Sequence, residues 1–361
     1  MKIIKKYVLY SFLRPFLTGL AAFLFLMILT HFFDFLHTFL EHKPPLGLLL
    51  TYFGYRIPNW LVNVTPVATL LGVLFSLGTL NRHHELTAIK SSGIKLIYVL
   101  KQLILFSLLL SILSGIINES IVPATNARAE NLFSIIKQES PEKTVYRTRK
   151  NFTYLSANRK LFFIQEYTDL EINGLKVIEF YSSSSREKKM ITSEKAIYNG
   201  SEWVLLNGTI RNFTKQGEIE SFTGFDKKIF SFDMSPENIS KPETKPEEMG
   251  FISLLKYIKK LEKGGFSATK EKVLLHHKIA FPFSNTIILI LGIPLALWGG
   301  MKSRTTGFFI SLVICFIYWG AISVGRALGQ AEVLPPAVGA WSANLIFLLI
   351  SIIMLKVSKI L

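Results

Sequence analysis

The chain has 361 residues, of which half are hydrophobic and 18% are charged, below the roughly 25% that is usual for soluble domains. This composition, with a formal net charge of +16 and a positive mean hydropathy, excludes an ordinary soluble enzyme and a disordered chain. A single cysteine, Cys315, excludes a disulfide-stapled secreted domain. The excess of cations suits nucleic acid or an anionic membrane, and the hydropathy favours the membrane, so no nucleic-acid partner is expected.

Six segments are apolar over the ~20 residues that a helix needs to cross a bilayer. They cover residues 12–39, 52–80, 96–121, 279–298, 307–328 and 337–355. The first is longer than the apolar core of a signal peptide and has no small-residue cleavage site after it, so we expect a retained helix. Pro58 and Pro66 lie inside the second, where neighbouring helices can satisfy the carbonyls that proline frees.

The termini and the loops on one side of these spans are basic. Six spans place both termini, the loop after the second span and the loop after the fourth on the same side. Their cations are Lys2, Lys5, Lys6, Arg82, Lys90, Lys95, Lys302, Arg304, Lys356 and Lys359. Basic loops remain in the cytoplasm, so we expect both termini there. The long segment between the third and fourth spans then lies on the opposite side, because long domains cross the membrane regardless of charge.

Residues 123–265, between the third and fourth spans, have shorter apolar runs and more polar residues. Six segments have the composition of strands: residues 152–157, 161–167, 175–181, 190–198, 203–213 and 219–232. The pairs Asn173-Gly174, Asn199-Gly200 and Asn207-Gly208 favour the tight turns of hairpins. This pattern predicts an antiparallel sandwich or open barrel. The phenylalanines of these strands suit either an ordinary core or a trough for lipid chains: Phe162, Phe163, Phe180 and Phe230.

Residues 235–248 are rich in proline, lysine and glutamate, which is typical of a linker. Apolar residues then recur at helical spacing, with lysines on the other face. These apolar residues are Phe251, Leu254, Leu255, Ile258 and Leu261. The spacing predicts an amphipathic helix over residues 250–265, which either lies at the membrane surface or packs against the β domain.

Motifs of enzyme chemistry are missing from the sequence. It has no phosphate-binding G-x-x-x-x-G-K-[ST] loop and no G-x-S-x-G nucleophile elbow. His84-Glu85 begins like the zinc motif H-E-x-x-H, but Ala88 stands where the second histidine would be needed. We therefore expect no catalytic residue, metal or cofactor in this chain, and favour a transporter or a scaffold.

Ionisable side chains are costly inside a membrane and tend to line a cavity. His31, Asp34 and His37 lie three residues apart near the outer end of the first span, on roughly one helical face. Arginines lie at the predicted outer ends of further spans: Arg56, Arg128 and Arg326. Such a set could hold an anionic headgroup, because arginine binds phosphate through two hydrogen bonds. The alternative is snorkelling, in which long side chains simply reach water.

The loop between the second and third spans contains a short amphipathic segment. Residues 85–91 place Leu86 and Ile89 on one side, and Gly93 is positioned to cap the carboxyl end. A short helix in a cytoplasmic loop can insert into a groove on a partner. A transporter without its own ATPase needs a lever of this kind.

This loop carries a family resemblance. The pattern Glu85-Leu86-x-Ala88 followed by Gly93, after a long second span, resembles the coupling helix of the LptF/LptG permeases. These are the membrane subunits of the ABC transporter that exports lipopolysaccharide. The six spans, the large domain between the third and fourth, and Leu334-Pro335-Pro336 before the last span are similar to that family. The helix over residues 250–265 and the proline pair resemble the LptG member more closely.

The resemblance implies a fold, partners and site residues. The inserted domain would be a periplasmic β-jellyroll, and an LptF-like second six-span permease would complete a cavity for lipopolysaccharide. Two copies of an LptB-like ATPase would use ATP and bind the coupling segment, and an LptC-like single-span protein would associate with the permeases. The coupling segment comprises Arg82, Glu85, Leu86, Ala88, Ile89 and Gly93. LptG-like sequences have phosphate-binding lysines where this chain has His31 and His37, with Lys43 further on.

The sequence thus predicts a polytopic α-helical membrane protein with six transmembrane helices and an inserted all-β, jellyroll-like periplasmic domain. Residues 1–122 would hold the first three spans, with the coupling helix at about 82–93. Residues 123–265 would hold the β domain, linker and amphipathic helix, and residues 266–361 the last three spans. Two alternatives are an ABC-type mechanotransmission permease for another lipid or lipoprotein, which usually has four spans, and a non-transport membrane scaffold.

Overall fold

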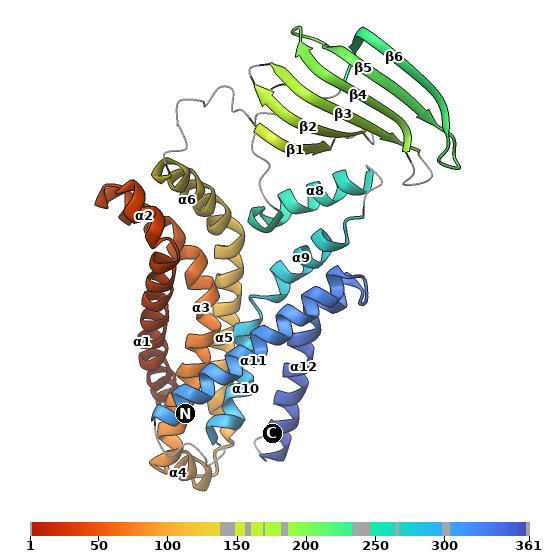
Figure 1. Ribbon diagram of the computed structural model, residues 1–361. Coiled ribbons are helices and arrows are strands. Elements are labelled where there is room, and N and C mark those ends of the chain that lie inside the picture. The colour runs from red at the N-terminus through yellow and green to blue at the C-terminus, as the bar shows by residue number, and fades with distance from the viewer. Residues whose placement is uncertain are drawn as a thin grey trace. The chain divides into compact units, whose positions relative to one another are not determined.

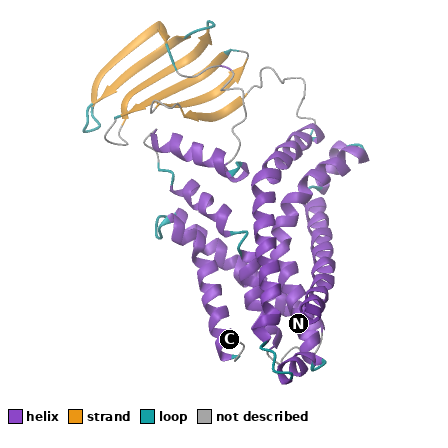
Figure 2. Cartoon of the chain, turned by 180° about the vertical axis from the view of Figure 1, so that it is seen from behind, coloured by secondary structure: helices purple, strands orange, loops and turns teal. Residues whose placement is uncertain are grey.

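A computed structural model describes the chain over eight ranges and one single residue (Figure 1). These are residues 2–137, 149–155, 160–168, 170–181, 187–232, 236, 246–263, 267–297 and 304–358. The predicted linker over residues 235–248 lies mostly outside them. The chain divides into two compact units, one of helices and one that contains the six strands and all but the first residue of helix α8. Figure 2 shows the strands gathered in one sheet.

The helical unit contains all six predicted spans. Its elements are α1 (Lys2–Asp34), α2 (Leu36–His42), α3 (Leu46–Arg82), α4 (Glu85–Ser91), α5 (Leu96–Ile116), the π-helical turn η1 (Ile117–Ile121), α6 (Val122–Ile136), α9 (Thr269–Ala280), α10 (Ser284–Leu297), α11 (Arg304–Gln330) and α12 (Pro336–Val357). Within the part of the chain that the structure describes, five helices are long and apolar enough to cross a membrane, and six if the bent pair α9–α10 counts as one span. Figure 1 shows that α1 begins and α12 ends at the same end of this unit as α4.

The helix of the third span continues beyond the apolar segment that the sequence predicts. It runs without a break from Leu96 to Ile136, past residue 121, where that segment ends. Pro123 lies in the first turn of α6, directly after the π-helical turn. Proline has no N–H to donate, and the wider hydrogen-bonding pattern of a π turn lets the helix pass it. The helical unit therefore extends well beyond the domain boundary expected at residue 122.

The fourth predicted span, residues 279–298, contains a bend near its beginning. Helices α9 and α10 meet at 55° across a short turn. A break of this kind leaves carbonyl oxygens without their helical donors, and in a membrane other groups must satisfy them. Here the Asn344 amide on α12 donates to the Ala280 carbonyl oxygen at 2.7 Å. The Tyr318 hydroxyl on α11 donates to the side-chain oxygen Oδ1 of Asn344 and so holds the side-chain amide in place.

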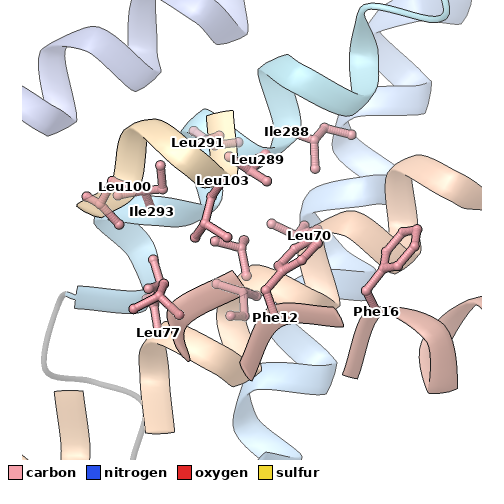
Figure 3. Close-up of a cluster of buried hydrophobic side chains, with 14 of the residues drawn as sticks. Phe12, Phe16, Leu70, Leu77, Leu100, Leu103, Ile288, Leu289, Leu291 and Ile293 are labelled. Carbon is pink, nitrogen blue, oxygen red and sulfur yellow. The ribbon is translucent and has the colours of Figure 1, made fainter. Parts of the chain in front are cut away.

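The core of the helical unit is built around α3, the most buried of the candidate spans (Figure 3). Phe12 and Phe16 of α1 stack at 5.5 Å and pack beside Leu70. Two glycines allow this close approach of helices. A Cβ atom at Gly72 would lie 2.8 Å from the Phe12 ring, and one at Gly292 of α10 would lie 2.3 Å from a methyl group on α3.

The second unit is an antiparallel sheet, and the predicted inserted all-β domain is confirmed. Its strands are β1 (Arg149–Leu155), β2 (Lys160–Thr168), β3 (Glu171–Phe180), β4 (Glu187–Tyr198), β5 (Trp203–Phe213) and β6 (Ile219–Phe230). Each strand pairs with its neighbour in the chain, in the order β1 to β6. The predicted amphipathic helix is α8 (Phe251–Lys263), preceded by a 3-10 turn at Pro246–Glu248. Protein covers its Leu254 and Ile258, which favours packing over exposure at a membrane surface.

Only one of the three predicted Asn-Gly turns connects two strands. Asn199-Gly200 lies in the β4–β5 turn, where the Asn199 side-chain oxygen accepts the backbone N–H of Glu202 at 2.8 Å. Asn173-Gly174 lies inside β3 and Asn207-Gly208 lies inside β5, so these two hairpin predictions are wrong. Gly174 has φ +67° and Asn207 has φ +50°. The left-handed tendency of both pairs is therefore used within strands rather than between them.

Candidate functional site

Helix α4 has the bounds that the sequence predicts, Glu85 to Ser91. Leu86 is 2% exposed and joins the hydrophobic core of the helical unit, with Ile89 packed against it. Ser92 caps the helix, and Gly93 follows with φ +77° and donates its N–H to the Lys90 carbonyl oxygen at 3.0 Å. One face of α4 is thus anchored to the core.

The opposite face of α4 is open to solvent. Arg82, Thr87, Ala88 and Lys90 are exposed, and Glu85 is half-buried. The Tyr7 hydroxyl, on the first turns of α1, donates a hydrogen bond of 2.9 Å to Oε2 of Glu85. The sequence analysis missed Tyr7 because 78 residues separate it from Glu85 and no local pattern links them.

A polar cluster joins α1, α3 and α6 at the end of the helical unit away from α4. Arg56 of α3 forms an ion pair with Glu130 of α6 at 2.8 Å. Nε2 of His31, on α1, lies 2.6 Å from the Tyr52 hydroxyl on α3. The Arg56 guanidinium lies 5.7 Å from the centre of the Tyr52 ring. Two of the predicted headgroup residues, His31 and Arg56, therefore have partners within the chain.

Aromatic rings enclose this cluster. The His31 ring lies 4.8 Å from Phe35, 5.1 Å from Trp60 and 6.0 Å from Phe53, measured between ring centres. Tyr52 is fully buried, and the Arg56 side chain is only 16% exposed. The Glu130 carboxylate neutralises this cation and links α6 to α3, while the buried Arg56 Nε has no hydrogen-bond partner among the described residues.

The other predicted headgroup residues on the first helices are open to solvent. Asp34, at the end of α1, is exposed and within electrostatic range of His31. His37 of α2 is 91% exposed at its side chain and lies 3.5 Å from Glu41. Lys43 is exposed and ends α2 with φ +43°. The sequence predicts one helical face for His31, Asp34 and His37, but α1 ends at Asp34, so His37 lies on the separate helix α2.

Two arginines have no carboxylate partner among the residues that the structure describes. Arg128 of α6 is exposed, and its guanidinium lies 5.7 Å from the centre of the Tyr55 ring. Arg326 of α11 has a buried Nε without a hydrogen-bond partner. It lies within electrostatic range of His277 on α9 rather than of the His31 cluster. Among the described residues, these two arginines thus differ from Arg56, which is paired with Glu130.

Glu119 in the π-helical turn is a second site that the sequence analysis missed. Its Oε2 accepts the backbone N–H of Phe251, the first residue of α8. Its Oε1 lies 3.7 Å from Nζ of Lys278, whose side chain is 9% exposed. Single π turns inside α-helices occur frequently at functional positions. The turn here directs one carboxylate toward the two segments by which the chain returns to the helical unit.

The sheet carries a groove of about 1180 Å³ on strands β2 to β6. Phe163 and Phe225 line it together with polar side chains such as Lys176 and Asp226. Phe163 is 38% exposed, whereas Phe162 is fully buried in the core of the sheet. Phe162 is therefore a core residue, and Phe163 lines the groove; a lipid in this groove stays a prediction.

Comparison with known proteins identifies a family. The model of the lipopolysaccharide export system permease LptF/LptG matches residues 6–357. Lipopolysaccharide export system permease protein LptG of Haemophilus influenzae is 23% identical over 304 residues, or 82% of each chain. The LptG protein of Escherichia coli K12 is 21% identical over 80% of this chain and 79% of its own. The LptF protein of E. coli K12 is 16% identical over 94% of this chain and 92% of its own.

Proposed function

Since this chain belongs to the family of lipopolysaccharide export system permeases LptF/LptG, we propose that it is a membrane subunit of an ABC transporter. The transporter takes lipopolysaccharide from the inner membrane and passes it to a periplasmic bridge toward the outer membrane. The observation that carries this proposal is the family match, which spans the helices, α4 and the β insertion alike. The higher identity to the two LptG relatives than to LptF supports the LptG-like role.

The proposed partners are those that the family resemblance implies. An LptB-like ATPase dimer hydrolyses ATP, an LptF-like permease completes the cavity, and an LptC-like single-span protein joins them. The exposed face of α4 is the contact with the ATPase, and Glu85 meets it at the start of that helix. The basic termini and α4 lie at one end of the helical unit, which supports a cytoplasmic position for this end and a periplasmic position for the β domain.

The free cations hold the lipid phosphates. Arg128, Arg326 and Lys43 contact the headgroup, while Arg56 and His31 keep α1, α3 and α6 in place around it. Support for this division comes from the Arg56–Glu130 ion pair and from the lack of such a partner for Arg128 and Arg326 within the described residues. Acyl chains lie against apolar side chains of the spans, and ATP-driven motion of α4 moves the lipid toward the sheet.

A purification from native membranes in mild detergent tests the assembly. Mass spectrometry of the copurifying chains is expected to identify a stoichiometric ABC ATPase and a second six-span permease. A chain that purifies alone, reproducibly and in several detergents, would contradict the proposal. Within the complex, Glu85→Ala is expected to uncouple ATP hydrolysis from lipid release, and unchanged export in cells by this variant would exclude the lever.

Photo-crosslinking to lipopolysaccharide tests the headgroup site. Arg128→Gln and Arg326→Gln are expected to reduce crosslinking several-fold, because each removes a cation without an internal partner. Lys101→Gln is the matched control, since Lys101 is an exposed cation on α5 outside the proposed site. Equal crosslinking in all three variants would support snorkelling instead.

A further inference from the structure

The sequence analysis singled out Glu85, and the structure shows what holds it. We propose that Tyr7 is a positioning residue for the coupling glutamate. Its hydroxyl fixes Oε2 of Glu85, so that Oε1 is presented in one orientation to the ATPase. This inference rests on the proposed function, because it assigns the way in which α4 is prepared for its partner.

Helix α4 needs such support. With seven residues it is far shorter than the ~12–15 that an isolated helix requires in water. Its N-cap residue, His84, adopts φ +60° and makes no side-chain capping hydrogen bond. Leu86 fixes the position of the helix, but it does not fix the side chain of Glu85, which starts the helix beside solvent. A long carboxylate side chain in that position has several open rotamers, and the Tyr7 hydrogen bond selects among them.

The backbone of α1 at Tyr7 is held firmly, although the Tyr7 residue itself is 48% exposed. The next residue, Val8, is 1% exposed, and Phe12 one turn later is fully buried; both belong to the same hydrophobic core as Leu86. The backbone of α1 and the backbone of α4 are thus fixed to one core, and the hydrogen bond joins two side chains whose main chains cannot drift apart. The donor is neutral and the acceptor is charged, which makes the bond stronger than one between neutral groups.

An alternative role for Tyr7 is that of an ordinary tyrosine at the membrane–water interface. Tyr10 provides the comparison, because it lies on the same helix three residues later and is 66% exposed. Among the described residues its hydroxyl has no side-chain hydrogen-bond partner. Interfacial anchoring alone would make Tyr7→Phe and Tyr10→Phe equivalent, whereas the positioning role distinguishes them.

The test uses the whole complex in nanodiscs with the ABC ATPase that copurifies with it. Tyr7→Phe is expected to raise the ATPase concentration needed for half-maximal assembly about three- to tenfold, the effect of one lost hydrogen bond. Thermal stability of the permease is expected to stay unchanged, and Tyr10→Phe is expected to bind the ATPase normally. In a Glu85→Gln background, Tyr7→Phe is expected to add less than twofold, because the charged acceptor is already gone.

Two results would overturn the role of Tyr7. One is an equal effect of Tyr7→Phe and Tyr10→Phe, and the other is the same effect of Tyr7→Phe with and without the Glu85 carboxylate. The proposed function fails separately: if Glu85→Gln alone leaves ATPase assembly and coupling intact, then the coupling site is wrong. If Glu85→Gln weakens coupling and Tyr7→Phe does not, only the positioning role is excluded.

Discussion

Removing Glu130 tests whether Arg56 is a structural cation. Glu130→Ala leaves the Arg56 guanidinium, which is 16% exposed, without its carboxylate at 2.8 Å. Breaking a fully buried ion pair from one side costs about 3–5 kcal/mol. Because Glu130 itself is 45% exposed, water replaces part of the lost interaction, and we expect a loss of about 1–3 kcal/mol. For a helical unit of this size that corresponds to a fall of several degrees in Tm.

Thermal unfolding of the purified chain in detergent measures this loss. Tryptophan emission follows the transition of the whole chain, which has five tryptophans, and Trp60, whose ring lies 5.1 Å from the His31 ring, contributes the signal from the cluster. In a double-mutant cycle with Arg56→Met, the double variant is expected to lose less free energy of unfolding than the sum of the two single losses. Glu41→Ala is the control, because its partner His37 is 91% exposed. The reasoning is refuted if Glu130→Ala costs no more than Glu41→Ala, or if the cycle is additive.

Two further substitutions test other parts of the helical unit. Gly72→Ala is expected to lower Tm by several degrees because its Cβ would lie 2.8 Å from a phenylalanine ring on α1, whereas Gly54→Ala, with open space around it, is expected to leave Tm equal or higher. Glu119→Gln is expected to lower the free energy of unfolding by about 1–2 kcal/mol, because the amide leaves the Lys278 ammonium without a counter-charge. If this loss is no larger than that of the exposed control Glu41→Ala, the contact between Glu119 and Lys278 does not stabilise the protein.

Local signals gave the correct elements. The spans follow from hydropathy alone, and α4 follows from the spacing of Leu86 and Ile89 together with Gly93. Each of these signals lies within a few residues of the structure that it specifies. The Asn-Gly pairs were less informative, because a left-handed φ serves a strand irregularity as well as a hairpin: Asn207 has φ +50° inside β5.

Contacts between distant segments were beyond the reach of the sequence patterns. Nothing near Arg56 indicates that Glu130, 74 residues later, neutralises it. The bend between α9 and α10 depends in the same way on Asn344, which reaches the freed carbonyl oxygen of Ala280 from another helix. The sequence therefore grouped cations near the predicted span ends, but it could not separate those that are paired in the structure from those that are not.

The paired polar residues of the helical unit share one role, because each of them links two helices. Tyr7 joins α1 to α4, His31 joins the other end of α1 to α3, and Arg56 joins α3 to α6. Each contact fixes a different pair of helices, so together they set where the exposed face of α6 lies. Arg128 is exposed on α6 and lies against the Tyr55 ring of α3, whereas Arg56 is paired with Glu130. Because the Arg56–Glu130 pair holds α6 against α3, stability measurements at Arg56 must accompany the lipid-binding measurements that test the proposed role of Arg128.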